Sequence, residues 1–182
     1  NTGVKRPTVV NMSWGYFAQF TGDPTSGVYR GAAWNYGDPS FNTSNALWAN
    51  AGIIPGTANG GATRRLPGTN AFTDVEVEDM IDEGIHICIA AGNNYYKADV
   101  STGVDYNNTV TAGGTTYSYH RGSSPKTTRA FMVGCVDSNT YGANLDGLVG
   151  FSTKGPLVNI HAPGSNIASV CSNTNAGYTT TT

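Results

Sequence analysis

Three continuous runs of apolar residues predict the strands of a buried sheet. They cover residues 8–13, 85–93 and 130–137, and each ends at a glycine or a polar residue. Val, Ile, Ala and Met dominate these runs. Continuous apolar strands are typical of parallel sheets, because crossover helices cover both faces of such a sheet. The pattern therefore predicts an α/β fold with a parallel sheet.

A helix is predicted directly before the second run. Thr73-Asp74-Val75-Glu76 has the form of a capping box, in which a hydroxyl and a carboxylate satisfy free N–H groups at a helix N-terminus. Val77, Met80 and Ile81 then form an apolar stripe, and Gly84 ends the pattern. We expect about three turns of helix, acidic on the outer face. A helix that leads straight into a buried strand is an α/β crossover.

Two long segments show neither helical nor strand periodicity. Residues 16–72 and 95–130 are rich in Gly, Asn and Thr, so we expect irregular insertions with a little local helix near residues 45–51. Trp34 and Trp48 indicate that the first segment packs on something. The first segment is therefore expected to form a surface excursion that leaves the sheet and returns to it.

Composition excludes two classes of partner. Charged residues make up 12% of the 182-residue chain, the net charge is −2, and no cluster of Lys and Arg is larger than a pair. A nucleic-acid surface needs more positive charge than this. The longest apolar runs fall far short of the roughly 20 residues of a membrane helix. We expect no nucleic-acid partner and no membrane span.

The three cysteines are expected to be structural. Cys88 and Cys135 lie inside apolar runs, where a cysteine usually acts as a small buried hydrophobe, and Cys171 lies in the polar tail. Three cysteines do not make a disulfide framework.

Candidate chemistry lies where the predicted strands end, because open α/β sheets bind ligands at the carboxyl ends of their strands. Ser13-Trp14-Gly15 follows the first run, and Ala91-Gly92-Asn93 closes the second. An Asn held behind a Gly presents a carboxamide donor that suits an oxyanion. On these residues alone, a Gly-Asn pair is more commonly a simple turn.

The order of the segments resembles the subtilisin-like serine peptidases. Val-Val-Asn-Met-Ser-Trp-Gly, Ala-Ala-Gly-Asn, Val-Gly-Cys-Val-Asp, Phe-Ser-Thr-Lys-Gly-Pro and Ile-His-Ala-Pro-Gly occur here in that family's order. The core segments are 8–15, 73–94 and 131–170, and a tail covers 171–182. The resemblance implies a three-layer α/β domain, a parallel sheet with helices on both faces. Residues 1–182 would be a partial domain, truncated at both ends, with two long insertions.

The resemblance also implies roles for the residues at the strand ends. Asn93 resembles the family's oxyanion-hole side chain, and Ser13-Trp14-Gly15 resembles the strand that pairs with the substrate backbone. Ala91 and Gly92 resemble one wall of the specificity pocket. In a complete protein, these residues would serve the hydrolysis of a peptide or protein substrate by acyl transfer.

The family's catalytic Asp, His and Ser have no counterpart in this sequence. Neither His-Gly-Thr-His nor Gly-Thr-Ser occurs in it, and the family pattern would place these motifs before Asn1 and after Thr182. His86, His120 and His161 fall in strand, insertion and scaffold positions, where we expect structural roles. The 182-residue chain alone is therefore expected to be inactive.

An alternative function stays open at this stage. The chain could be a non-catalytic structural or interaction module with a subtilase fold, whose long insertions make assembly contacts. Residues 95–99 and 119–125 resemble subtilase-like domains among the structural proteins of tailed phages, which would imply virion assembly partners. Secretion and virion association are both compatible with the sequence. A nucleotide-binding domain is disfavoured, because no Gly-rich phosphate loop follows any predicted strand.

The resemblance also raises the question of a bound calcium ion. Subtilases often bind calcium at loop sites, and Asp99, Asp105 and Asn107 carry oxygen atoms that suit such an ion. Their spacing matches no fixed calcium motif. We therefore assign no metal ligand and no cofactor.

Overall fold

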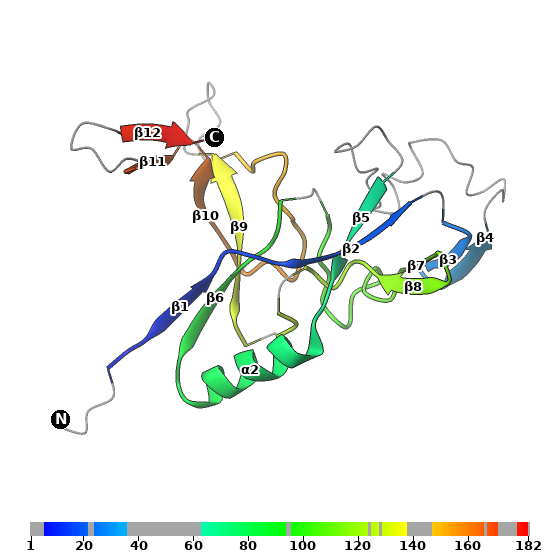
Figure 1. Ribbon diagram of the computed structural model, residues 1–182, viewed down its shortest axis with the longest axis horizontal. Helices are drawn as coiled ribbons and strands as arrows, with labels where there is room; N and C mark the ends of the chain where they lie inside the picture. Colours follow the sequence, from blue (N-terminus) through cyan, green and yellow to red (C-terminus); the bar gives the residue numbers. More distant parts are fainter. Residues whose placement is uncertain are drawn as a thin grey trace.

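A four-stranded parallel sheet of order β1-β6-β9-β10 forms the centre of the fold. The computed structural model describes residues 6–21, 24–35, 63–93, 96–123, 125–127, 129–137, 147–165, 167–170 and 178–181. The strands of the central sheet are β1 (Val9–Met12), β6 (His86–Ala90), β9 (Phe131–Asp137) and β10 (Ile160–Ser165). Figure 1 shows them side by side, with helix α2 (Ala71–Asp82) along the lower side of the sheet.

Alternate residues of the sheet hold it against α2. Ile87 and Ile89 of β6 are buried in one apolar cluster with Met132 of β9 and Val77 of α2. Residues at the alternate positions point to the other face of the sheet, because successive side chains of a strand face opposite ways. The predicted α/β fold with a parallel sheet is confirmed. Among the described residues α2 is the helix packed on this sheet, whereas the resemblance implies helices on both faces.

Helix α2 begins earlier than the sequence predicts. Its N-cap is Asn70, whose side-chain oxygen accepts hydrogen bonds from the backbone N–H groups of Phe72 and Thr73. Asn is among the preferred N-cap residues, so the expected capping box at Thr73 is wrong. Gly84 follows the helix with a φ of 82°, which suits its expected role in ending it.

The two segments expected to be irregular contain strands, so that expectation is wrong. An antiparallel pair joins β2 (Tyr16–Thr21) to β5 (Thr63–Gly68). A second antiparallel sheet has the order β4-β3-β7-β8. Its strands are β3 (Ser26–Tyr29), β4 (Ala32–Asn35), β7 (Thr109–Ala112) and β8 (Thr115–Ser118). Figure 1 shows these accessory strands grouped at one side of the parallel sheet.

The accessory strands enclose an apolar core of their own. Leu66 and Val110 are fully buried there, and Phe20, Trp34 and Tyr119 pack with them in the same buried cluster. The core draws on both long segments, because β3 pairs with β7 across the chain. The local helix expected near residues 45–51 and the tryptophan at position 48 lie outside the described residues.

A last antiparallel pair joins β11 (Ile167–Val170) to β12 (Tyr178–Thr181). In the part of the chain that the structure describes, no helix has the length and apolarity to cross a membrane.

Candidate functional site

The parallel pairing of β1 and β6 brings the two candidate segments to one edge of the sheet. Met12 of β1 lies beside Ile89 of β6 in the ladder. Both strands run in the same direction, so Ser13–Gly15 and Ala91–Asn93 leave the sheet next to each other. Two cavities open at this edge, with volumes of about 240 Å³ and about 560 Å³. Both are lined by Ser13, Ala90, Gly92 and Asn93.

The smaller cavity lies between two glycines and a buried serine. Gly15 and Gly92 line it, and Ser123 packs against both. A Cβ atom on Gly15 would lie 2.8 Å from the Oγ atom of Ser123, and one on Gly92 would lie 3.0 Å from the same atom. Gly92 also has a φ of 105°, a conformation that favours glycine. Any larger residue at either glycine would therefore narrow this cavity.

Aromatic side chains form the outer rim of the smaller cavity. Trp14 is 42% exposed and Phe17 is 44% exposed, and both line the cavity. The Trp14 ring meets Tyr16 edge-on, with ring centroids 5.4 Å apart. Tyr16 is held in turn by a hydrogen bond of 2.7 Å between its hydroxyl group and that of Thr73. This arrangement fixes an apolar surface beside the strand end.

The larger cavity lies on the face of the sheet opposite α2. Ala90, Val133, Cys135 and Ala162 line it, and in β6 and β9 these positions alternate with the residues that pack on α2. The Cys135 N–H group donates to the Oγ atom of Ser152 at 2.9 Å. Burial, aided by the nearby Asp137 carboxylate, raises the pKa of the Cys135 thiol. The thiol is therefore protonated near neutral pH and is not an activated nucleophile.

Backbone hydrogen bonds fix the segment on both sides of Asn93. The Ala91 N–H group donates to the Val133 carbonyl, and the Gly92 carbonyl accepts from the Thr153 N–H group, each at 2.9 Å. Further along, the Ala98 N–H group donates to the Lys154 carbonyl at 2.7 Å. Asn93 itself is exposed at the rim of both cavities. A carboxamide on such a fixed segment can donate a hydrogen bond to a bound ligand.

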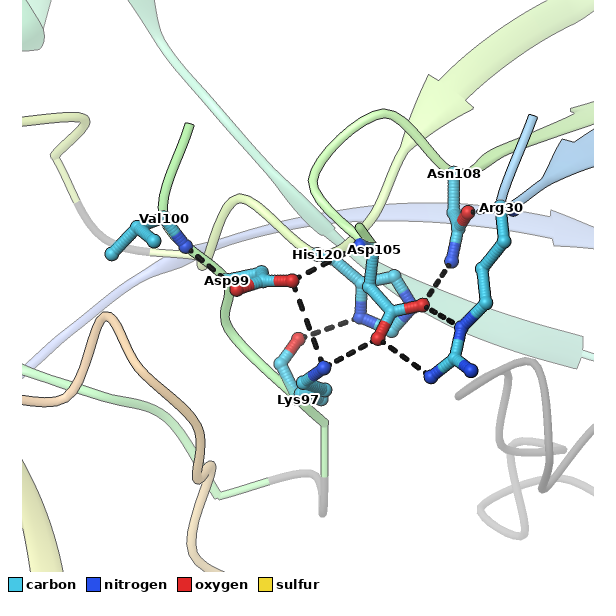
Figure 2. A network of polar contacts seen from close by, with 7 residues as sticks. All are labelled: Arg30, Lys97, Asp99, Val100, Asp105, Asn108 and His120. Atoms are coloured by element: carbon cyan, nitrogen blue, oxygen red, sulfur yellow. Dashed lines mark hydrogen bonds and ion pairs between the residues drawn. The ribbon is translucent and has the colours of Figure 1, made fainter. Parts of the chain in front are cut away.

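A charged network holds the loop that follows Asn93 (Figure 2). The Asp105 carboxylate is almost completely buried and accepts two hydrogen bonds from the Arg30 guanidinium, at 2.8 and 3.1 Å. Lys97 and Asn108 donate to the same carboxylate. The hydrogen bonds from Arg30, aided by Lys97, hold the pKa of the Asp105 carboxyl well below its usual range. Arg30 lies in the turn between β3 and β4, so the network joins the accessory sheet to this loop.

The remaining members of the network complete its hydrogen bonding. Asp99 accepts from the backbone N–H groups of Val100 and Asp105, each at 3.0 Å. His120 is buried, and its Nδ1 atom lies 2.7 Å from the Lys97 carbonyl oxygen. Two cations and two carboxylates therefore form one neutral cluster between this loop and the turn that joins β3 to β4. These contacts favour a structural role for His120. His86 on β6 and His161 on β10 are exposed.

A lysine ammonium occupies the place between the two buried carboxylates. The Lys97 Nζ atom lies 3.6 Å from Asp99 and is hydrogen-bonded to Asp105. The Asn107 side-chain oxygen accepts a hydrogen bond from Arg121. Among the described residues it makes no hydrogen bond within the network of these two carboxylates. Within the described residues, no group of three His, Cys, Asp or Glu side chains is placed to hold a metal ion. The charge that a cation would supply at Asp99 and Asp105 comes from the protein itself.

The structure adds Ser123 to the residues that the sequence singled out. All six predicted residues, Ser13, Trp14, Gly15, Ala91, Gly92 and Asn93, line one or both cavities. Ser123 follows Gly122 in a stretch that the sequence presents as an irregular insertion. The turn-forming Gly-Ser-Ser-Pro sequence was its sole signal.

The chain was compared with known proteins. Residues 4–182 match the family model described as the subtilase family. A search of curated proteins found no match.

Proposed function

The chain belongs to the subtilase family, and from that premise we propose that it carries the substrate-binding and oxyanion-stabilising part of a serine endopeptidase. Such an enzyme hydrolyses peptide bonds by acyl transfer. The observation that best supports this proposal is the meeting of Ser13–Gly15 with Ala91–Asn93 at the rim of the same two cavities. A substrate at this edge of the sheet contacts both segments.

Asn93 supplies the oxyanion donor in this proposal. When a nucleophile attacks the scissile carbonyl group, negative charge develops on its oxygen atom, and hydrogen-bond donors aimed at that atom lower the barrier. Donors work best when they need no rearrangement during the reaction. The backbone hydrogen bonds at Ala91, Gly92 and Ala98 support such preorganisation. In the family mechanism a Ser attacks, a His takes its proton and an Asp orients that His, and we assign none of these three roles to a residue of this sequence.

The substrate lies along the end of β1 in this proposal. Among the described strands β1 is the outermost of the parallel sheet, and the backbone of Ser13–Gly15 continues it; an extended peptide can pair with such a strand end through main-chain hydrogen bonds. One substrate side chain then enters the smaller cavity between Gly15 and Gly92, where Ser123 limits its depth. The rings of Trp14 and Phe17 are partly exposed at the mouth of this cavity, so they favour apolar side chains of the substrate there.

Turnover by the natural full-length protein tests this proposal. We expect it to cleave fluorogenic peptides and to react covalently with a serine-directed phosphonate. The 182-residue chain alone serves as the control and is expected to give neither signal. A folded full-length protein with no turnover and no labelled serine would overturn the proposal and favour a non-catalytic interaction module. Labelling of a serine within these 182 residues would contradict the assignment of roles.

A further inference from the structure

A second pair of cavities shares two basic residues. One cavity, of about 360 Å³, is lined mainly by polar residues, with Thr69, Thr116 and Ser118 among them. We call it the hydroxyl-lined cavity. The other, of about 170 Å³, has Pro125, Met132 and Leu157 in its wall and is called the apolar cavity. Arg121 and Lys126 line both cavities.

Arg121 is held in place by three contacts. Its guanidinium carbon lies 4.6 Å from the ring centroid of Tyr106, a cation–π distance. Its Nε atom donates to the Tyr106 carbonyl at 3.3 Å, and Nη2 donates to the Asn107 side chain at 3.0 Å. These two hydrogen bonds use two of the five N–H donors that a guanidinium carries. The remaining donors have no protein partner in the described part of the chain, so Arg121 is an oriented cation with free hydrogen-bonding capacity.

Lys126 adds a second cation whose backbone is fixed. Its N–H group donates to the Asp74 carboxylate at 2.7 Å. Its ammonium group makes no hydrogen bond or ion pair with the described residues, and the described lining of the hydroxyl-lined cavity contains no carboxylate. Glu78 lines the apolar cavity, but its carboxylate pairs with Arg129 at 2.8 Å. The two cavities therefore meet at two cations whose side chains form no ion pair with the described residues, with the Asp74 and Glu78 carboxylates nearby.

We propose that these two cavities bind the C-terminal carboxylate of a peptide whose last side chain is apolar. Arg121 and Lys126 receive the carboxylate, because a planar guanidinium matches its two oxygen atoms and an ammonium group adds a second charge. The last side chain enters the apolar cavity against Met132 and Leu157. The preceding peptide groups lie in the hydroxyl-lined cavity, where Thr69 and Thr116 can exchange hydrogen bonds with them.

This site goes beyond the proposed peptidase function and does not depend on it. Its residues differ from those that line the cavities around Asn93. Hydrolysis of a peptide bond creates a new C-terminal carboxylate, so products of a peptidase are one source of the ligand. Arg121 and Ser123 flank Gly122, and the same loop therefore contributes to both sites.

A matched pair of peptides tests the site. N-acetyl-Ala-Ala-Leu with a free carboxylate and the same peptide with a C-terminal amide are titrated into the 182-residue chain, and amide chemical shifts are followed by NMR. We expect the carboxylate form to bind about tenfold more tightly or better, the range for hydrogen bonds to charged groups. N-acetyl-Ala-Ala-Gly, which leaves the apolar cavity empty, should bind more weakly than the Leu peptide. Equal binding of the carboxylate and amide forms, or no binding of either, would overturn the proposal.

Charge-removing variants locate the binding. Lys126→Gln and Arg121→Gln should each weaken binding of the Leu peptide by about tenfold. Arg6→Gln removes the same charge from an exposed residue before β1 and should leave the affinity unchanged. Because the Lys126 side chain has no partner among the described residues, Lys126→Gln should fold normally even if loss of the Arg121 contacts disturbs the loop. Peptide binding that survives Lys126→Gln at full affinity would contradict this site.

Discussion

Asp105→Asn should destabilise the chain strongly, because it removes one charge from a buried network. The carboxylate is 3% exposed and accepts from Arg30, Lys97 and Asn108. An amide of the same shape keeps the packing but leaves two cations without their shared counterion. Its NH₂ group would also face the donors of those cations.

The size of this effect follows from the exposure of the partners. Breaking a buried ion pair by removing one member costs about 3–5 kcal/mol. The side chains of Arg30 and Lys97 are 53% and 36% exposed, so both can regain some hydration. We therefore expect the lower end, about 3 kcal/mol, out of the roughly 5–15 kcal/mol that stabilises a typical domain.

Urea denaturation of matched variants measures the effect. Asp82→Asn makes the same chemical change at a surface ion pair, in which Asp82 and Arg129 lie 2.6 Å apart and are 66% and 47% exposed. Exposed pairs contribute about 0–1 kcal/mol, so the control should change the free energy of unfolding little. If Asp105→Asn costs no more than Asp82→Asn, the buried network does not stabilise the loop as argued.

The difference in unfolding free energy between the natural chain and Asp105→Asn should also depend on pH, which provides a second test of the buried network. The folded state holds the pKa of Asp105 below its usual range, so this carboxylate stabilises the fold at every pH above the unfolded value of about 3.9. That contribution is lost as the pH falls toward the lower, folded pKa. The gap in unfolding free energy between the natural chain and Asp105→Asn should therefore stay constant from pH 7 to about 5 and narrow below about 4. A gap that widens on acidification would contradict the assigned pKa shift.

Three further experiments test the cavity, the helix cap and the buried thiol. Gly15→Ala should destabilise the fold by about 1–3 kcal/mol in urea denaturation and raise KM in an active protein, because the new Cβ atom meets Ser123. Gly147→Ala is the control, because a Cβ atom there would meet no atom within 4 Å. Asn70→Ala should cost about 1 kcal/mol through loss of the α2 cap, and no change would remove Asn70 as the N-cap. With Cys88 and Cys171 replaced by serine, alkylation of Cys135 should be slow at neutral pH and accelerate above pH 9, because its pKa is raised; fast reaction at pH 7 would contradict that shift.

The parallel sheet could be predicted from the sequence because its strands form unbroken apolar runs, even though the described residues of β6 and β9 are fully buried only at alternate positions. The runs that became β1, β6 and β9 carry this apolar pattern. Strands β3, β4 and β8 do not, because their residues are mostly partly or fully exposed and rich in Thr, Gly and Ala. Their pairing depends on distant partners, such as Val28 with Thr109, which no local pattern reveals.

The candidate site was predictable to the extent that it is built from strand ends. Ser13 and Asn93 come directly after apolar runs, so the edge of the sheet on which they meet follows from the parallel topology. Ser123 comes from a loop whose position depends on tertiary packing against Gly15 and Gly92. The ion pair of Arg30 with Asp105 likewise joins residues far apart in the chain, and the sequence offered Asp105 as a candidate calcium ligand. Long-range charge pairing leaves no periodic trace in a sequence.

The kinetics of Asn93→Ala in the full-length protein test whether Asn93 stabilises the oxyanion. If Asn93 donates to the oxyanion, kcat should fall about 10²–10³-fold, the size of the effect known for the oxyanion-hole asparagine of subtilisin. KM should change little, because the donor engages the developing oxyanion more strongly than the ground-state carbonyl group. Titration of active sites with a phosphonate corrects for any loss of folded enzyme. An unchanged kcat, or a loss confined to KM, would contradict the role of Asn93 in stabilising the transition state.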